Sequence, residues 1–76
     1  MNREDFLTKF KEIIQYEGDE ELSFDSNLVD IEEWDSLSMI SVVAFMDSEF
    51  GKKVTVNEIK DIKTIKMLAE LVGVNE

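Results

Sequence analysis

The most apolar segment of the chain, residues 36–50, begins directly after Asp35 and stops before Gly51. Its large apolar side chains recur every three or four residues, which places them on one arc of a helix. Asp35 is a good N-cap because its carboxylate can accept from the free amides of the first turn. Gly51 suits the position just beyond the last turn. The pattern predicts a helix over residues 36–50, with a buried face formed by Met39, Val42, Val43, Met46 and Phe50.

An amphipathic pattern also covers residues 3–16, whose apolar side chains fall within one arc of about 120°. We expect Asn2 to cap this helix and Gly18 to end it. The apolar side chains of the arc are expected to belong to the core.

Two shorter signals follow the central helix. Residues 55–58 read Thr-Val-Asn-Glu, a capping box that predicts a short helix. Thr64 is the expected cap of a last helix, which Gly73 is expected to close. The fold prediction is all-α: a small four-helix bundle, with three main helices and one short helix, forming a single domain over residues 1–76.

Residues 17–34 form a loop between the first two helices that is long for so small a domain, which points to a functional role. A calcium loop beginning at Asp25 would place Asp30 where the turn glycine belongs and Ser36 where the bidentate glutamate belongs. No metal site is therefore expected. The loop is expected to be anchored in the core by Leu22, Phe24, Leu28 and Ile31.

The composition excludes several classes of function. The 76 residues include no proline, cysteine or histidine, so disulfides, zinc sites of the usual kind and imidazole catalysis are excluded. The chain shows neither a membrane-spanning stretch nor a signal-peptide pattern at its start. A cytoplasmic location is expected.

The net charge of −10 is unevenly distributed. No basic residue lies between Lys11 and Lys52, whereas residues 12–51 hold twelve acidic residues. A field of this sign repels nucleic acid and anionic lipid, and steers basic protein surfaces toward the region around Ser36. It also favours a monomer. The alternative is that the acidic residues serve solubility alone.

Ser36 occupies the first position of the central helix, where its hydroxyl is expected to be exposed. The amide N–H groups of a helix N-terminus point outward, and the helix dipole favours negative charge there. A phosphate ester on Ser36 would suit this position.

The opposite side of the central helix is small, partly apolar and nearly uncharged. A helix face that meets only solvent more often carries Lys and Glu, so this face is a candidate docking surface for a partner. The alternative is that scattered exposed apolar residues are ordinary. The predicted docking residues are Leu37, Ser38, Ser41, Ala44, Phe45 and Ser48.

The order of these features resembles the acyl carrier protein family over nearly the whole chain. The tripeptide Asp35-Ser36-Leu37 stands at the head of the second helix, after a long loop with Asp25-Ser26-Asn27-Leu28 and Asp30. Phe50-Gly51 ends that helix, and a short third helix and a Thr-capped fourth helix follow.

The resemblance implies that Ser36 carries a 4′-phosphopantetheine arm, transferred from coenzyme A by a phosphopantetheinyl transferase with magnesium at that enzyme's site. It implies that Asp35 and Leu37 frame recognition by the transferase. The domain has no thiol of its own, so the arm would supply one. The carrier would not be an enzyme. Its implied partners are an acyl- or aminoacyl-loading ligase and downstream transferases with basic docking surfaces.

The sequence departs from carriers of bacterial fatty acid synthesis, which it resembles. Those carriers have acidic residues two and five positions after the modified serine and an acidic third helix, whereas this chain has Ser38, Ser41, Asn57 and Lys60. In having a tryptophan, Trp34, directly before Asp35, the chain resembles specialised carriers, including aminoacyl and peptidyl ones. These departures favour a carrier dedicated to one pathway.

Two alternatives stay open at this point, whereas a serine hydrolase is strongly disfavoured. Met39, Met46, Ile59 and Ile62 could border a pocket for a short acyl chain, or could simply pack. A serine hydrolase would need a histidine base, which the chain lacks. An interaction module would keep the same fold, leave Ser36 unmodified and bind a basic protein partner through its acidic surface.

Overall fold

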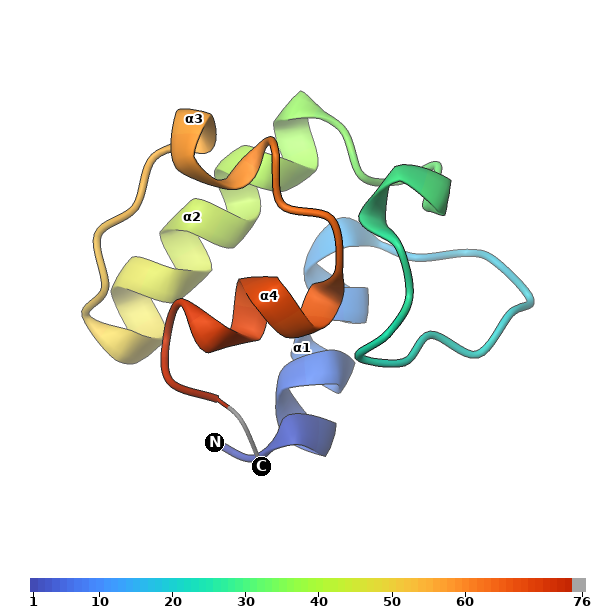
Figure 1. Cartoon of the computed structure of the whole chain (residues 1–76), viewed down its shortest axis with the longest axis horizontal. Helices are drawn as coiled ribbons and strands as arrows, with labels where there is room; N and C mark the ends of the chain where they lie inside the picture. The colour runs from blue at the N-terminus through green and yellow to red at the C-terminus, as the bar shows by residue number, and fades with distance from the viewer. Residues whose placement is uncertain (75–76) are drawn as a thin grey trace.

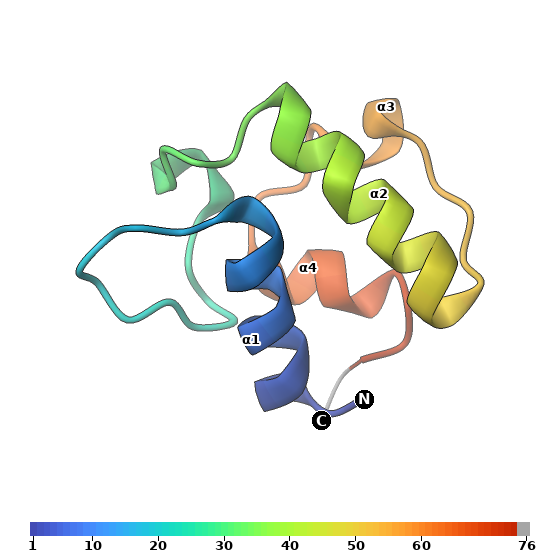
Figure 2. The ribbon, with the colours of Figure 1, turned by 180° about the vertical axis from the view of Figure 1, so that it is seen from behind.

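The computed structural model of the chain describes residues 1–74 and confirms the all-α prediction. Figures 1 and 2 show α4 on one face of the molecule, α1 and α2 on the other, and α3 beside the N-terminal half of α2. Residues 1–74 contain no strand, although an isolated β-bridge joins Asn27 and Thr64. The elements in chain order are α1 (Arg3–Ile14), the 3-10 helix η1 (Leu28–Asp30), α2 (Ser36–Phe50), α3 (Val56–Ile59) and α4 (Ile65–Glu70).

The predicted N-caps are confirmed. The side-chain oxygen of Asn2 accepts from the amide of Asp5 at 2.7 Å. Thr55 and Glu58 form the reciprocal capping box at the start of α3, and the Thr64 side chain caps α4. Each cap satisfies amides that a helix start leaves without an intrahelical partner. The starts of the helices are therefore set by local side chains.

The end of α1 differs from the prediction. The helix ends at Ile14 because Gln15 adopts the left-handed conformation, with φ 56°. Gly18 is not the stop, since it lies beyond this turn. A Cβ atom on Gly18 would clash with the hydroxyl oxygen of Tyr16, so the absence of a side chain at Gly18 makes room for the tyrosine ring.

The end of α4 also differs. The helix ends at Glu70, and a turn over residues 71–73 follows it. Gly73 has φ 81°, as a closing glycine should, but it ends this turn and not the helix itself.

The core is centred on the two phenylalanines of α1, Phe6 and Phe10, which are almost completely buried. The ring of Phe6 lies 6.2 Å from that of Phe24, 6.1 Å from that of Phe45 and 6.4 Å from that of Phe50. These centroid distances lie in the range of favourable aromatic pairs. One side chain of α1 thus contacts both the long loop and α2.

The long loop is packed against the core, as predicted. Its four expected anchors, Leu22, Phe24, Leu28 and Ile31, are all buried. The part nearest α1 projects away from the helices (Figures 1 and 2), whereas the later part contains η1. The described helices include none long and apolar enough to cross a membrane.

We expect Ile59→Val to lower the free energy of unfolding by about 0.5–1.5 kcal/mol, because it removes a methylene from a fully buried site. Urea denaturation followed by circular dichroism measures the change. Ile40→Val is the matched control. Because Ile40 is 56 % exposed, this substitution should change the free energy of unfolding by no more than about 0.5 kcal/mol. Equal losses in the two variants would contradict the described packing of α3.

Candidate functional site at the start of helix α2

Asp35 caps α2, as predicted. Its backbone is extended, and its carboxylate accepts from the amide of Ser38 at 2.9 Å. This backbone hydrogen bond is the main reason that the pKa of Asp35 lies below its usual value. The carboxylate is therefore charged at neutral pH, and it satisfies one of the free amide N–H groups at the helix N-terminus.

Ser36 is the first residue of α2, and its side chain is exposed. The side chain of Leu37 next to it is 75 % exposed. The start of a fifteen-residue helix thus presents a primary hydroxyl beside an apolar side chain. A group bonded to the Ser36 oxygen can extend into solvent without displacing any core residue, so the site can accept a bulky phosphate ester.

The segment that leads into α2 is fixed by a chain of hydrogen bonds. The hydroxyl of Ser38 donates to the backbone carbonyl of Glu33. The carboxylate of Glu33 accepts from the amide of Glu17 at 3.1 Å, which joins the two ends of the long loop. The ring of Trp34 lies 5.7 Å from that of Phe10 in the core. Ser36 is consequently attached to a backbone that is held on both sides.

The predicted docking face is only partly exposed. Leu37, Ser41, Ala44 and Ser48 are exposed and lie along one side of α2. The prediction is wrong for Ser38, which is buried at 8 % exposure and serves the hydrogen bond to Glu33.

Phe45 is also misplaced by the prediction. It is half-buried and packs against the core, with its ring 5.7 Å from that of Phe50. Ile40, which the prediction omitted, is 56 % exposed. At 100° per residue Ile40 falls between the exposed positions 36 and 44, so the same helical projection could have found it. The exposed face of α2 consists of Leu37, Ile40, Ser41, Ala44 and Ser48.

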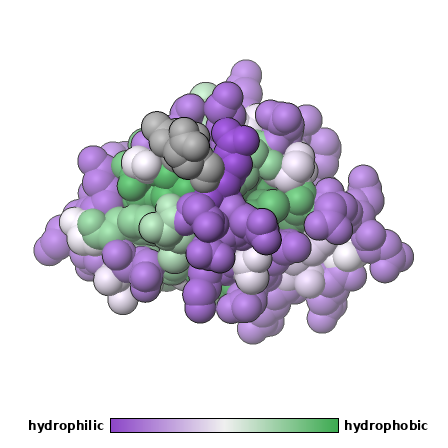
Figure 3. Space-filling view, turned by 90° about the horizontal axis from the view of Figure 1, so that it is seen from below, coloured by the Kyte–Doolittle hydropathy of each residue, from purple (hydrophilic) through white to green (hydrophobic). Residues whose placement is uncertain are grey.

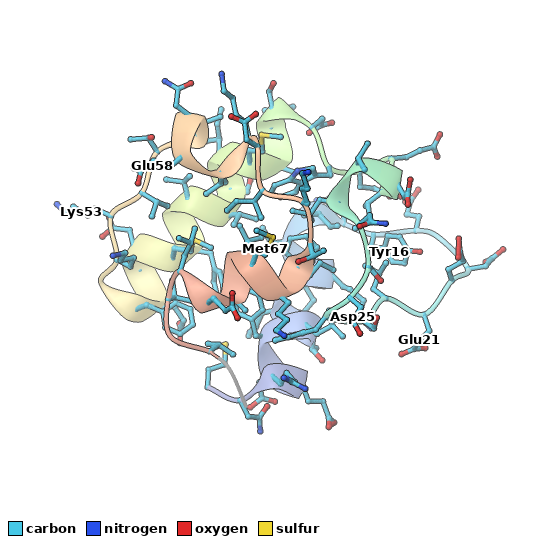
Figure 4. The ribbon with its side chains drawn as sticks, in the orientation of Figure 1. Tyr16, Glu21, Asp25, Lys53, Glu58 and Met67 are labelled. Carbon is cyan, nitrogen blue, oxygen red and sulfur yellow. The ribbon has the colours of Figure 1, made fainter. Side chains whose placement is uncertain are left out.

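Acidic and basic residues are unevenly distributed along the chain, although Lys63 and Lys66 adjoin the long loop through backbone hydrogen bonds. Figure 4 places Glu21 and Asp25 on the projecting loop and Lys53 on the opposite side. Five lysines lie between residues 52 and 66, whereas no basic residue lies between residues 12 and 51. Over residues 1–74, no three acidic side chains gather closely enough to hold a metal ion.

Apolar groups also reach the surface. Figure 3 shows hydrophobic residues between hydrophilic ones on the lower face of the molecule. Single exposed apolar residues are ordinary, and only a contiguous patch indicates a binding surface. The large exposed apolar side chains include Met1, Val29, Leu37, Ile40 and Met67.

The chain was compared with protein families, curated proteins and solved structures. The family model described as a phosphopantetheine attachment site matches residues 4–72. No curated protein matches the chain. No solved structure matches it either.

The cap geometry predicts a pH-dependent contribution of Asp35 to stability. The folded pKa is lowered, so this contribution is complete above the unfolded pKa, about 4, and is lost as pH falls through the folded value. We expect Asp35→Asn, which retains a capping oxygen, to be less stable than the wild type at pH 7. The difference should vanish in strong acid. Urea midpoints measured between pH 2 and pH 7 test this.

Asp35→Ala provides the control, because alanine cannot cap at any pH. It should be less stable than Asp35→Asn at both ends of the pH range. A difference between wild type and Asp35→Asn that is independent of pH would show that the charge of Asp35 makes no contribution.

Proposed function

Since the chain belongs to the phosphopantetheine attachment family, we propose that Ser36 is its attachment residue, framed by Asp35 and Leu37. Members of this family are carriers that hold a covalent 4′-phosphopantetheine and do no chemistry themselves, so this protein is a carrier and not an enzyme. The position of Ser36 supports the assignment: its exposed hydroxyl stands at the first position of α2.

Attachment is a phosphoryl transfer. The Ser36 oxygen forms a bond to the phosphorus next to the pantetheine of coenzyme A, and the bond from that phosphorus to the adenosine 3′,5′-bisphosphate leaving group breaks. The proton of the hydroxyl passes to a base on the phosphopantetheinyl transferase. The resulting phosphodiester is an anion at the N-terminus of a long helix, where the dipole favours it.

The arm supplies the thiol that holds cargo as a thioester. The chain has no cysteine, so it offers no thiol of its own that could compete for cargo. Tethering raises the local concentration of cargo at the active site of a partner. We propose that the cargo is an acyl or aminoacyl group of a specialised pathway, delivered by a loading ligase and passed to downstream transferases.

The proposal of a specialised carrier is supported by the surface around Ser36. Between Asp35 and Asp47 the helix α2 carries no charged residue, and its exposed face includes the apolar Leu37 and Ile40. The acidic residues lie instead on the loop before α2. We propose that partners meet α2 with an apolar surface and meet the loop with basic groups.

The attachment site is tested by intact mass spectrometry after incubation with coenzyme A, magnesium and a promiscuous phosphopantetheinyl transferase. The wild type should gain the mass of one phosphopantetheinyl group, and Ser36→Ala should gain none. Ser48→Ala is the matched control, an exposed serine near the other end of the same helix whose replacement should leave the modification intact.

The opposite outcome has a clear meaning. A wild type that gains no mass, while circular dichroism shows an intact helical fold, would overturn the assignment of Ser36. The interaction-module alternative, an unmodified acidic bundle that binds a basic partner, would then be favoured.

The charge pattern predicts that the modification slows as salt rises, because acidic residues near Ser36 steer a basic transferase surface. Asp30→Asn combined with Glu32→Gln should lower the rate at low salt and weaken this dependence. Both residues are exposed and lie just before α2. Initial rates at subsaturating carrier over a series of salt concentrations measure the effect.

The control removes the same charge elsewhere, with Glu49→Gln and Glu70→Gln at the ends of α2 and α4. This pair should retain most of the salt dependence. If the two double variants change the rate equally, the net charge of the protein determines the effect, and the position of the acidic residues on the loop does not.

A further inference from the structure

A groove of about 450 Å³ lies between the end of α1 and the start of α2, immediately beside the proposed attachment residue. Asp35 and Leu37, the two neighbours of Ser36, both line it. Figure 2 shows the end of α1, the start of the projecting loop and the start of α2 on one side of the molecule. Ser36 itself does not line the groove, so an arm anchored there reaches the groove by passing over Leu37 or Asp35.

The groove exists because of two local features. The left-handed conformation of Gln15 ends α1 at Ile14, and Gln15 and Glu17 beyond it line the groove. On the facing side, α2 contributes the small side chains of Ser38 and Ser41. The buried hydroxyl of Ser38 is already bonded to the Glu33 carbonyl, so it is not available to a ligand.

The lining of the groove matches the neutral part of a pantetheine arm. That part carries two amides, a hydroxyl and a pair of methyl groups. Ile13 and Leu37 provide apolar surface for the methyl groups, while the side chains of Gln15 and Ser41 provide hydrogen-bond donors and acceptors for the amides. The carboxylates of Glu17 and Glu33 also line the groove, and they disfavour entry of the phosphate.

The opposite side of α2 offers less room. Met46 and Ile59, two of the residues considered for an acyl pocket between α2 and α3, have no exposed surface. The capping box holds the start of α3 in place. Interiors packed in this way accept an added group only by displacing side chains.

We propose that the pantetheine segment of the arm rests in the α1–α2 groove, against Ile13, Gln15, Leu37 and Ser41. The inference rests on the proposed attachment at Ser36. A resting site of this kind keeps the thiol close to the carrier between encounters, and a partner releases the arm by covering the exposed face of α2.

The test compares ¹⁵N-labelled protein before and after modification, once intact mass has shown complete conversion. If the protein is not converted, the attachment proposal fails, and this outcome is distinct from a failure of the proposal that the arm rests in the groove. In the amide spectrum we expect shift changes at Ile13, Gln15 and Ser41, in addition to those next to Ser36. Contacts from the methyl groups of the arm to Ile13 should appear in a nuclear Overhauser spectrum.

Ser41→Phe fills the groove and should abolish the shift changes at Ile13 and Gln15 on modification. Glu49→Phe is the matched control, because Glu49 is exposed near the other end of the same helix and lies neither in the groove nor on the exposed face described above. It should retain them. If the phenylalanine at position 41 blocks the transferase, Gln15→Gly serves instead. It removes the side-chain amide at a residue whose φ of 56° suits glycine, and should weaken the contacts to Ile13.

Two results would overturn the inference. Shift changes confined to the residues adjoining Ser36 would show an arm that is free in solvent. Shift changes at Ile59 and Ile62 without changes at Ile13 would place the arm between α2 and α3.

Discussion

The structure depends on a short set of backbone hydrogen bonds between the long loop and the start of α4. The amide of Leu28 donates to the carbonyl of Lys63 at 2.7 Å, and the amide of Lys66 donates to the carbonyl of Phe24 at 2.9 Å. These bonds satisfy backbone groups that buried loop residues would otherwise leave unpaired. They fix Phe24 and Leu28 in the core, and thereby set the direction from which the chain enters α2.

A carrier needs a rigid anchor and a mobile arm. The anchor is rigid because the loop is joined to itself through Glu17 and Glu33, to α2 through Ser38, and to α1 through the Trp34–Phe10 contact. The hydroxyl of Ser36 stands outside all these contacts. If the arm is attached at Ser36 as proposed, the groove lined by Asp35 and Leu37 offers it a place to rest, while the uncharged exposed face of α2 is left for a partner.

The bounds of α2 and the N-caps of all four α-helices could be predicted from sequence because each depends on residues close together in the chain. Asp35 and Gly51 mark the two ends of α2 by their own side-chain and backbone chemistry. The end of α1 could not be predicted this way, because a glutamine adopts a conformation in which glycine is more usual. The helical projection misplaced Ser38 and Phe45, since it has no information on which neighbouring elements cover a helix.

The sequence by itself determined the helical class, the helix starts and the exposed serine at the head of α2, because capping and amphipathic spacing act over a few residues. It also determined the excess of acidic residues before α2 and the lack of a thiol. Only the tertiary structure decided that Ser38 turns inward to Glu33, that Ile40 faces outward, and that a groove opens between α1 and α2. These features depend on how segments distant in the chain pack together, and local patterns do not encode that packing.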